Sequence, residues 1–359
     1  MVPLIGATYS LLSSISKKYP IENGFKARYR LSAAVSLVLE PFRKLEDLIT
    51  QNRINSFKPA DDPVFIIGHW RSGTTYLHNL LSRDKQFGYC STYQSVLPKL
   101  TLSNQWWLSY FIKLIMPSHR PADNVELNLA FPQEEEFALG NLTQWCFYYA
   151  WYFPKHFSEL VEEHIERKSD DKEYINQWKK IYTRFISIAL LNTNGKIYLS
   201  KNPPNTMRLD LLTELFPNAR FIYISRNPYE VFESSKRFIK GVMPTTQLQS
   251  YDQTCLDTAL PSMMQKFFSR YEHTKALIKP GRIMEITYES LLKNPKDNLE
   301  SIYKTLELTG FETASKSFQE FTNKGKQHTV HNYTFKPETI KLINAIWSNS
   351  FERMGYQKL

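Results

Sequence analysis

Short apolar runs alternate with helix-like patterns over most of the chain. Four runs are rich in β-branched and aromatic residues and have the length of buried strands, namely residues 63–67, 197–200, 220–225 and 282–287. Each is followed by a short polar loop and then by a helical pattern. Because parallel strands need such crossovers, the order predicts a three-layer α/β/α fold around a central, mostly parallel sheet.

Residues 1–58 form a predicted helical extension that precedes the first strand. Its apolar positions recur at helical spacing, and Pro41 interrupts the pattern, so we expect a kink or a new helix start there. The apolar positions are Val38, Phe42, Leu45 and Ile49.

Residues 92–194 form a predicted helical insert between the first two strands. We expect this insert to line a pocket for a flat or hydrophobic substrate, because it is rich in aromatic side chains. Since the chain has no internal repeat and no linker rich in Gly, Pro or Ser, residues 1–359 are predicted to form one domain. The aromatic residues are Trp106, Trp107, Phe111, Trp145, Phe147, Tyr148, Tyr149, Trp151 and Tyr152.

Composition narrows the class of protein. The chain has 359 residues, of which 42% are hydrophobic, so it has ample material for a packed core. Its net charge of +10 favours an anionic partner. The basic clusters are too short for a nucleic-acid groove, so no nucleic-acid partner is expected.

Cysteine usage and hydropathy predict a cytoplasmic enzyme. The three cysteines, Cys90, Cys146 and Cys255, are far apart and form no CxxC pair, which argues against a disulfide framework and a structural zinc. We see no signal peptide and no run of about 18 apolar residues.

The loop at residues 68–75 has the glycine spacing of a phosphate-binding P-loop. Thr74 stands where the lysine of GxxxxGK[ST] is expected, and Arg71 supplies a cation upstream. The loop amides and the following helix N-terminus would cradle an anion. A kinase needs that lysine and an acidic residue for magnesium, and we find no convincing one, so we expect no metal. A simple glycine turn before a helix is the alternative.

Two segments together resemble the bacterial sulfotransferases. Residues 67–78 resemble their 5′-phosphosulfate loop, and residues 221–235 resemble their 3′-phosphate motif, with Arg226 and Ser234 at the matching spacing. The resemblance spans about residues 60 to 335. It implies a fold related to nucleotide kinases, 3′-phosphoadenosine 5′-phosphosulfate (PAPS) as donor and its desulfated form, PAP, as product. The donor-binding loop residues that it implies are Arg71, Ser72, Gly73, Thr74 and Thr75.

The resemblance assigns further residues to the donor site. Lys201 resembles a lysine that contacts the transferring group, although a solvated lysine at a strand end is a comparable alternative. Tyr288 resembles the tyrosine beside the adenine, and Tyr76 would stack near the same base, with core packing as the competing explanation for both. The segment Lys324-Gly325-Lys326 resembles a loop that closes over the 3′-phosphate, and a solvated turn is the alternative.

The catalytic base is predicted among acidic residues of the insert. Pro203 occupies the position of the histidine base used by cytosolic animal sulfotransferases. Residues 131–139 resemble an acidic segment of the bacterial enzymes, where a carboxylate buried among aromatics would have a raised pKa. We expect that Glu134, Glu135 and Glu136 do not all point inward on one helix, and favour Glu135, then Glu134. Acidic residues also simply favour a helix N-terminus.

His331 is the third candidate for the base. It lies in a segment that resembles a late His-x-Tyr element of the family. A single histidine is more often structural than catalytic, so it ranks below the two glutamates.

The predicted reaction is metal-independent, in-line transfer of a sulfuryl group from PAPS to a hydroxyl of a small hydrophobic acceptor, such as a sterol, a lipid or a phenol. One alternative is a small-molecule kinase on the same fold. Another is an inactive protein that binds a membrane surface, suggested by the aromatic and basic segment 106–116. Peripheral membrane contact is therefore a possible feature, and the sequence leaves the acceptor and the oligomeric state open.

Overall fold

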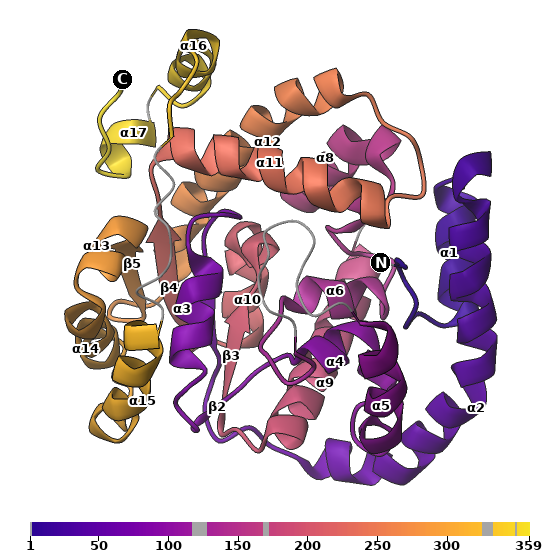
Figure 1. The fold of residues 1–359 in the computed structure, drawn as a ribbon. Helices are drawn as coiled ribbons and strands as arrows, with labels where there is room; N and C mark the ends of the chain where they lie inside the picture. The colour runs from indigo at the N-terminus through magenta and orange to yellow at the C-terminus, as the bar shows by residue number, and fades with distance from the viewer. Residues whose placement is uncertain (1, 117–127, 168–171, 325–332, 349) are drawn as a thin grey trace. The chain divides into compact units, whose positions relative to one another are not determined.

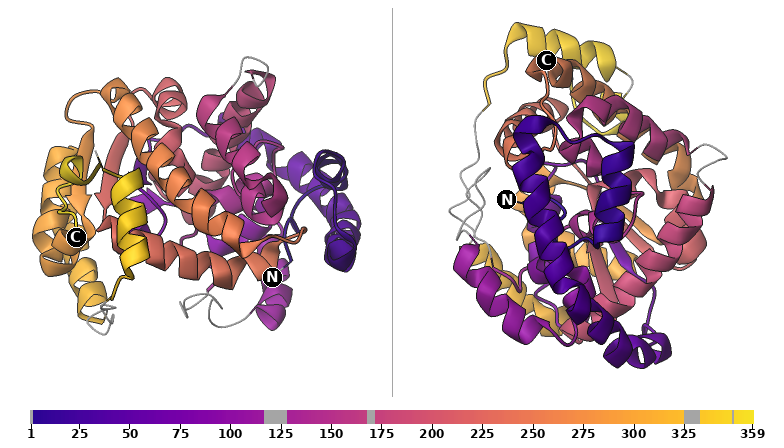
Figure 2. Two further views of the ribbon diagram at one scale, coloured as in Figure 1. Left: turned by 90° about the horizontal axis from the view of Figure 1, so that it is seen from above. Right: turned by 90° about the vertical axis from the view of Figure 1, so that its right-hand side faces the viewer.

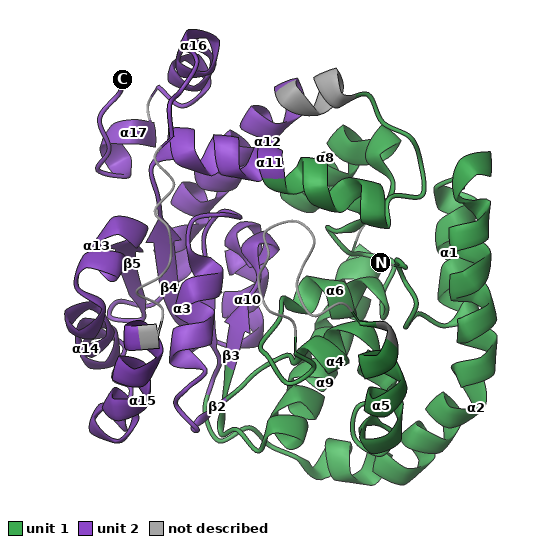
Figure 3. Cartoon of the chain, viewed as in Figure 1, with its two compact units in different colours: residues 1–61, 88–198, 238–252 green, residues 62–87, 199–237, 253–359 purple. Residues whose placement is uncertain are grey.

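The computed structural model describes residues 2–116, 128–167, 172–324, 333–348 and 350–359. The chain divides into two compact units, which Figure 3 colours separately. Unit 1 contains residues 1–61, 88–198 and 238–252, and unit 2 contains residues 62–87, 199–237 and 253–359. A single domain over residues 1–359 stays a prediction.

A parallel sheet is the centre of unit 2. Strand β1 (Val64–Ile67) pairs in parallel with β3 (Ile197–Lys201) and with β4 (Arg220–Ser225), and β4 pairs in parallel with β5 (Ile283–Thr287). The four predicted strands are therefore confirmed. The strand order is β2-β3-β1-β4-β5, where β2 (Phe87–Gly88) is too short to give a sequence signal.

Helices follow the strands of this sheet, as the α/β pattern requires. Helix α3 (Thr74–Leu81) follows β1, while β3 continues into a 3₁₀ turn, η5 (Pro203–Met207), before α10 (Leu209–Leu215). The two prolines begin this 3₁₀ turn, and the helix starts only at Leu209. The later helices are α12 (Gln253–Thr274), η6 (Lys275–Leu277), α13 (Tyr288–Lys293), α14 (Pro295–Thr305), α15 (Phe311–Lys324), α16 (Pro337–Ile346) and α17 (Ser350–Arg353).

Unit 1 is built from helices around an aromatic core. Trp145 and Trp178 are completely buried, and Trp145 stacks on His164 with ring centroids 4.5 Å apart. The helices are α1 (Tyr9–Lys18), η1 (Asn23–Phe25), α2 (Lys26–Ser56), α4 (Thr92–Val96), η2 (Pro98–Leu100), α5 (Gln105–Ile115), α6 (Glu135–Gly140), α7 (Tyr149–Tyr152), η3 (Pro154–His156), α8 (Phe157–Glu166) and α9 (Lys172–Thr193). Helix α11 (Pro228–Thr246) begins in unit 2 and ends in unit 1.

Helix α2 is the longest helix of the extension and continues through Pro41. The predicted new helix start at Pro41 is therefore wrong. Figure 1 shows α2 bending along its length, and Figure 2 shows its first part side by side with α1. Among the described helices, none combines the length and the apolar run needed to cross a bilayer.

Candidate active site

The loop between β1 and α3 has a backbone that only glycine tolerates at its first position. Gly68, Arg71 and Gly73 all have positive φ, at 137°, 68° and 98°. A Cβ on Gly68 would lie 2.4 Å from the carbonyl oxygen of Ile224, so the loop passes directly against β4. The Thr206 side chain fixes the backbone of Gly68, because its hydroxyl accepts from the Gly68 amide at 2.9 Å and donates to the Gly68 carbonyl at 3.1 Å.

The second half of the loop opens helix α3. Gly73 is the N-cap and makes no side-chain cap hydrogen bond, so the first-turn amides of α3 have no capping side chain. A Cβ on Gly73 would lie 2.2 Å from Cδ2 of Tyr288, which places the Tyr288 ring directly over the loop. Such uncapped amides at a helix N-terminus suit an anionic ligand.

Two arginines connect this loop with the segment after β4. Nε of Arg71 donates to Oγ of Ser234 at 3.0 Å, and Nη1 of Arg226 donates to the Arg71 carbonyl at 3.2 Å. Arg226 also forms an ion pair with Glu230 and lies 4.7 Å from the centroid of the Tyr288 ring. The side chains of both sequence motifs therefore share one network within unit 2.

Lys201 is a buried cation at the carboxyl end of β3. Its Cα is in register with Ile66 on β1, one residue before the end of that strand. Burial and then the charge of Lys201 hold the pKa of His78 well below its usual range, so the ammonium group acts on the inner face of α3. The carboxyl ends of parallel strands are where ligands bind in open α/β sheets.

Comparison with known proteins assigns the chain to a family. Residues 63–313 match the model of the sulfotransferase family. The chain belongs to the sulfotransferase family. Its relatives include the omega-hydroxy-beta-dihydromenaquinone-9 sulfotransferase Stf3 of Mycobacterium tuberculosis and of Mycobacterium bovis, each 28% identical over 93% of this chain and 84% of the relative.

Solved structures show the same fold. Sulfotransferase STF9 from Mycobacterium avium matches with a TM-score of 0.71 at 15% identity, over 98% of this chain and 97% of its own. Sulfotransferase STF1 from Mycobacterium tuberculosis matches with a TM-score of 0.61 at 16% identity, over 93% and 90% of the two chains. The predicted fold class is thereby confirmed for this sulfotransferase.

Family membership also confirms the predicted activity, PAPS-dependent transfer of a sulfuryl group to a hydroxyl acceptor. The loop fits such a donor, because the N-terminus of α3 has no capping side chain and Arg71 supplies a cation two residues before the N-cap Gly73. In the described part of the chain, no group of three or more His, Cys, Asp or Glu side chains could hold a metal ion.

Three consecutive glutamates of this sulfotransferase are buried in unit 1. Glu134 is 9% exposed, and Glu135 and Glu136 are fully buried, so the expectation that they do not all point inward is wrong. The reason is that Glu134 is the extended N-cap of α6 and only the other two belong to the helix. An extended residue before a helix points its side chain in a direction that helical spacing does not restrict.

Each glutamate has its own partners. Glu134 accepts a hydrogen bond from Tyr148, and Glu136 accepts from the Phe147 amide at 2.7 Å. Glu135 accepts from two tyrosine hydroxyls, those of Tyr182 and of Tyr198, the latter at 2.8 Å. Tyr198 belongs to β3, the strand that ends at Lys201, and burial and then the Glu135 charge raise its pKa well above the usual range.

The remaining predicted site residues are distributed as follows. Tyr76 lies in unit 2, where its ring is 5.9 Å from that of Phe321, and burial raises its pKa. Lys324 is the last residue of α15, whereas Gly325, Lys326 and His331 lie outside the described residues. The donor-loop residues belong to unit 2 and the three glutamates to unit 1 (Figure 3).

Sequence reasoning missed Thr206, Tyr182 and Tyr198. Thr206 reaches Gly68 across 138 residues of sequence, and Tyr182 and Tyr198 reach Glu135 across 47 and 63 residues. No local motif marks any of them, because their roles arise only from long-range contacts.

Proposed function

We propose that this sulfotransferase acts on the hydroxyl of a hydrophobic, lipid-like alcohol. The Stf3 relatives carry an omega-hydroxylated dihydromenaquinone in their name, and their similarity covers 93% of this chain. In this proposal the buried aromatic side chains of the helical insert at 92–194 form the acceptor pocket, the exposed rings of α5 lie outside it, and residues 1–359 work as one enzyme. The single observation that carries the proposed transfer chemistry is the Arg71–Ser234 hydrogen bond, which joins the two donor motifs.

The donor-binding roles follow from the chemistry of each group. The 5′-phosphosulfate is held by the α3 amides with Arg71, Ser72, Gly73, Thr74 and Thr75. Arg226 and Ser234 hold the 3′-phosphate, since a guanidinium forks onto phosphate and a hydroxyl adds a short donor. The rings of Tyr76 and Tyr288 flank the adenine, and Lys324, Gly325 and Lys326 are assigned to the 3′-phosphate.

Charge develops on the sulfuryl oxygens and on the leaving phosphate during transfer. Bound PAPS supplies the sulfuryl group, and this chain supplies cations. Lys201 and Arg71 stabilise the developing negative charge, and Lys201 does so from a buried position where electrostatic interactions are strong.

A carboxylate of the insert takes the proton from the acceptor hydroxyl. As the acceptor oxygen bonds to sulfur, its O–H bond breaks, and the sulfur–oxygen bond to the 5′-phosphate of PAP breaks with its electron pair going to the phosphate. Glu135 receives the proton in our proposal, because two tyrosine hydroxyls fix its orientation. Glu134 is the second choice and His331 the third.

We also propose that the enzyme is cytoplasmic and meets its lipid acceptor at the face of a membrane, as a peripheral protein. A hydrophobic alcohol is concentrated in bilayers, and the +10 net charge favours anionic surfaces.

Incubation with ³⁵S-labelled PAPS and a panel of alcohols tests the acceptor class. The panel contains an omega-hydroxylated isoprenoid quinone, a sterol, a phenol and a charged glycan. We expect label in the quinone or another lipid alcohol, and exclusive labelling of the glycan would refute the proposed acceptor. A parallel titration tests the donor, because PAP should bind without magnesium, and binding of Mg·ATP but not PAP would favour a kinase.

A further inference from the structure

Helix α2 has its polar side buried and its apolar side exposed. The buried positions follow helical spacing and are mostly polar, and the exposed stripe is apolar throughout, which is the reverse of a normal surface helix. The buried residues are Ser32, Ser36, Leu39, Arg43, Glu46, Thr50 and Ile54. The exposed stripe consists of Leu31, Val38, Phe42, Leu45 and Ile49, which are 49%, 68%, 36%, 49% and 59% exposed.

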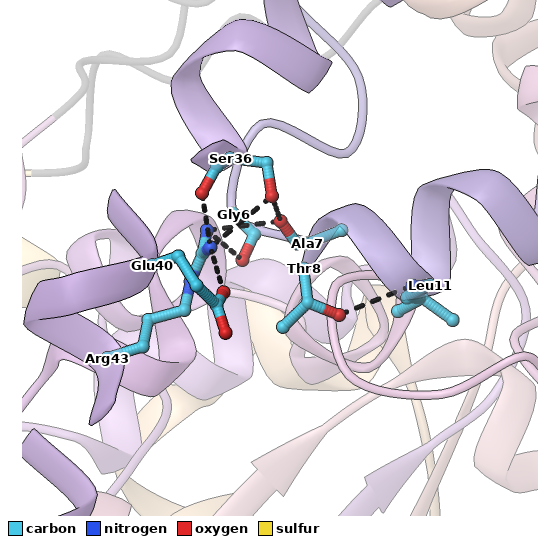
Figure 4. A network of polar contacts seen from close by, with 7 residues as sticks. All are labelled: Gly6, Ala7, Thr8, Leu11, Ser36, Glu40 and Arg43. Atoms are coloured by element: carbon cyan, nitrogen blue, oxygen red, sulfur yellow. Dashed lines mark hydrogen bonds and ion pairs between the residues drawn. The ribbon is translucent and has the colours of Figure 1, made fainter. Parts of the chain in front are cut away.

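Hydrogen bonds to the N-terminal segment fix the rotation of α2. The Ser32 hydroxyl donates to the Pro3 carbonyl and the Ser36 hydroxyl to the Ala7 carbonyl, both at 2.7 Å. Arg43 adds bonds to the carbonyl oxygens of Gly6 and Ala7 at 3.2 and 3.1 Å, as Figure 4 shows. Turning the apolar stripe inward would break these buried contacts, so the exposure of the stripe is built into unit 1.

Glu46 joins α2 to the start of helix α5. Its carboxylate accepts from the Leu102 amide at 2.6 Å, from the Ser103 hydroxyl at 2.6 Å and from the Asn104 side chain at 2.7 Å. Asn104 is the N-cap of α5, so this carboxylate anchors the beginning of α5 on α2. The rings of Phe42 and Trp107 are 5.1 Å apart, which adds an aromatic contact between the two helices.

Helix α5 adds a second exposed apolar stripe next to the first. Trp106, Tyr110 and Leu114 are spaced four residues apart and are 81%, 65% and 69% exposed, and Phe111 is 55% exposed. We call the two stripes together the α2–α5 face, which consists of Leu31, Val38, Phe42, Leu45 and Ile49 on α2 and Trp106, Tyr110, Phe111 and Leu114 on α5. Along α2 alone the face is about 27 Å long.

Basic side chains border this face. Lys26, Arg30 and Lys44 are exposed on one flank of the α2 stripe by helical periodicity, and Lys113 is exposed on α5. The exposed Asp47 of α2 forms an ion pair with Arg184. Apolar residues with tryptophan and tyrosine, bordered by lysine and arginine, are the composition of helices that lie in a membrane interface.

We propose that the α2–α5 face docks this sulfotransferase on an anionic lipid surface. The side chains protrude from two helices, a shape that a fluid interface accommodates without a complementary groove. The inference rests on exposure and charge in unit 1 and does not depend on the proposed acceptor. It also gives a physical route to that acceptor, because a docked enzyme meets a lipid alcohol at its own surface.

Flotation with the full-length protein tests the proposal. Vesicles of phosphatidylcholine and phosphatidylglycerol in equal amounts should carry the enzyme, and pure phosphatidylcholine vesicles should carry less of it. The variant Ile49→Ser/Trp106→Ser should lower the partition coefficient at least about tenfold, since two large apolar side chains leave the interface. Leu277→Ser, at a residue of unit 2 that is 54% exposed, is the matched control and should float like the natural protein.

Charge-reversal variants distinguish the contribution of the anionic lipid headgroups to binding from that of the apolar side chains. Lys44→Glu/Lys113→Glu should reduce flotation on the anionic vesicles, whereas Lys293→Glu/Lys296→Glu, with two exposed lysines of unit 2, should not. PAP affinity, measured by calorimetry, should be equal in all variants and shows that they are folded.

Three results would overturn the proposal. The first is that the natural protein stays at the bottom of the gradient, and the second is that the serine variant floats unchanged. The third is that light scattering shows a dimer of the natural protein and a monomer of the serine variant, which would make the face an interface between two copies. Sulfation of a water-soluble alcohol by the serine variant distinguishes failed docking from failed catalysis.

Discussion

Arg71 donates from Nε to Oγ of Ser234 at 3.0 Å, which ties the loop after β1 to the helix after β4. The two residues are 163 positions apart, and both were expected to bind the donor. Because Arg226 also donates to the Arg71 carbonyl, the groups proposed for the two ends of PAPS are linked by hydrogen bonds. A substitution at one end of the proposed donor site should therefore also alter the groups at the other end.

Arg71→Gly should weaken PAP binding without unfolding the protein. Arg71 has a φ of 68°, a conformation that glycine adopts more easily than arginine, so we expect an unchanged or raised Tm. Loss of a charged donor should raise the Kd for PAP at least about tenfold. Titration calorimetry and thermal unfolding give the two values.

Glu307→Gly is the matched control for Arg71→Gly. Glu307 is exposed and has a φ of 52°, so it shares the backbone strain but not the site. Glu307→Gly should leave the affinity for PAP unchanged. If Arg71→Gly binds PAP as tightly as Glu307→Gly does, Arg71 is not part of the donor site.

Gly73→Ala should lower both Tm and PAP affinity. The new Cβ would lie 2.2 Å from the Tyr288 ring, and φ is 98°. Adding Tyr288→Ala removes the clash but leaves a backbone cost of about 1–2 kcal/mol, so Tm should recover only in part. Gly24→Ala has open space around its Cβ and serves as the control. A Tm unaffected by Gly73→Ala would contradict the close approach of Tyr288.

Glu135→Gln should reduce kcat by about 10²–10⁴-fold and leave PAP affinity unchanged, as expected for loss of a general base. Glu136→Gln is the matched control, because Glu136 is equally buried but bonds the Phe147 amide. Of these two variants, only Glu135→Gln should lose turnover. If turnover falls in Glu134→Gln or His331→Ala instead, the base is that residue.

The stability of the protein should fall between pH 6.5 and 4 partly through His69. Burial lowers its pKa from 6.5 to about 4, so in this window the unfolded chain binds a proton that the folded chain does not. The contribution, on the order of 1–3 kcal/mol, is complete above pH 6.5 and is lost as the pH falls toward 4. His69→Gln should flatten the dependence of Tm on pH there, whereas the exposed control His273→Gln should not. An unchanged slope in His69→Gln would contradict this account.

The strand–loop–helix order and the donor loop were predictable from local sequence. Gly68 and Gly73 are required by backbone conformation within the loop itself, so their spacing carries the information. The short strand β2 and the 3₁₀ turn at Pro203–Met207 were not predicted, because two residues give no period and the prolines fit several turns.

The acidic segment was predictable only as a segment. Its composition marked Glu134 to Glu136 as unusual, but the burial of all three depends on Tyr148, Phe147, Tyr182 and Tyr198, which are distant in sequence. A carboxylate can be buried only where hydrogen-bond donors surround it, and helical spacing in the sequence does not predict where those donors lie.

The helical stripe of Val38, Phe42, Leu45 and Ile49 shows most clearly where prediction from sequence ends and tertiary structure decides. The sequence by itself determined that these residues share one face of a helix, and likewise it predicted an anion-binding loop at residues 68–75. Only the tertiary structure decided that this apolar face is exposed, because Pro3, Gly6, Ala7 and the 102–104 loop offer partners to the polar side. Periodicity groups side chains on a face, and long-range hydrogen bonds choose which face is buried.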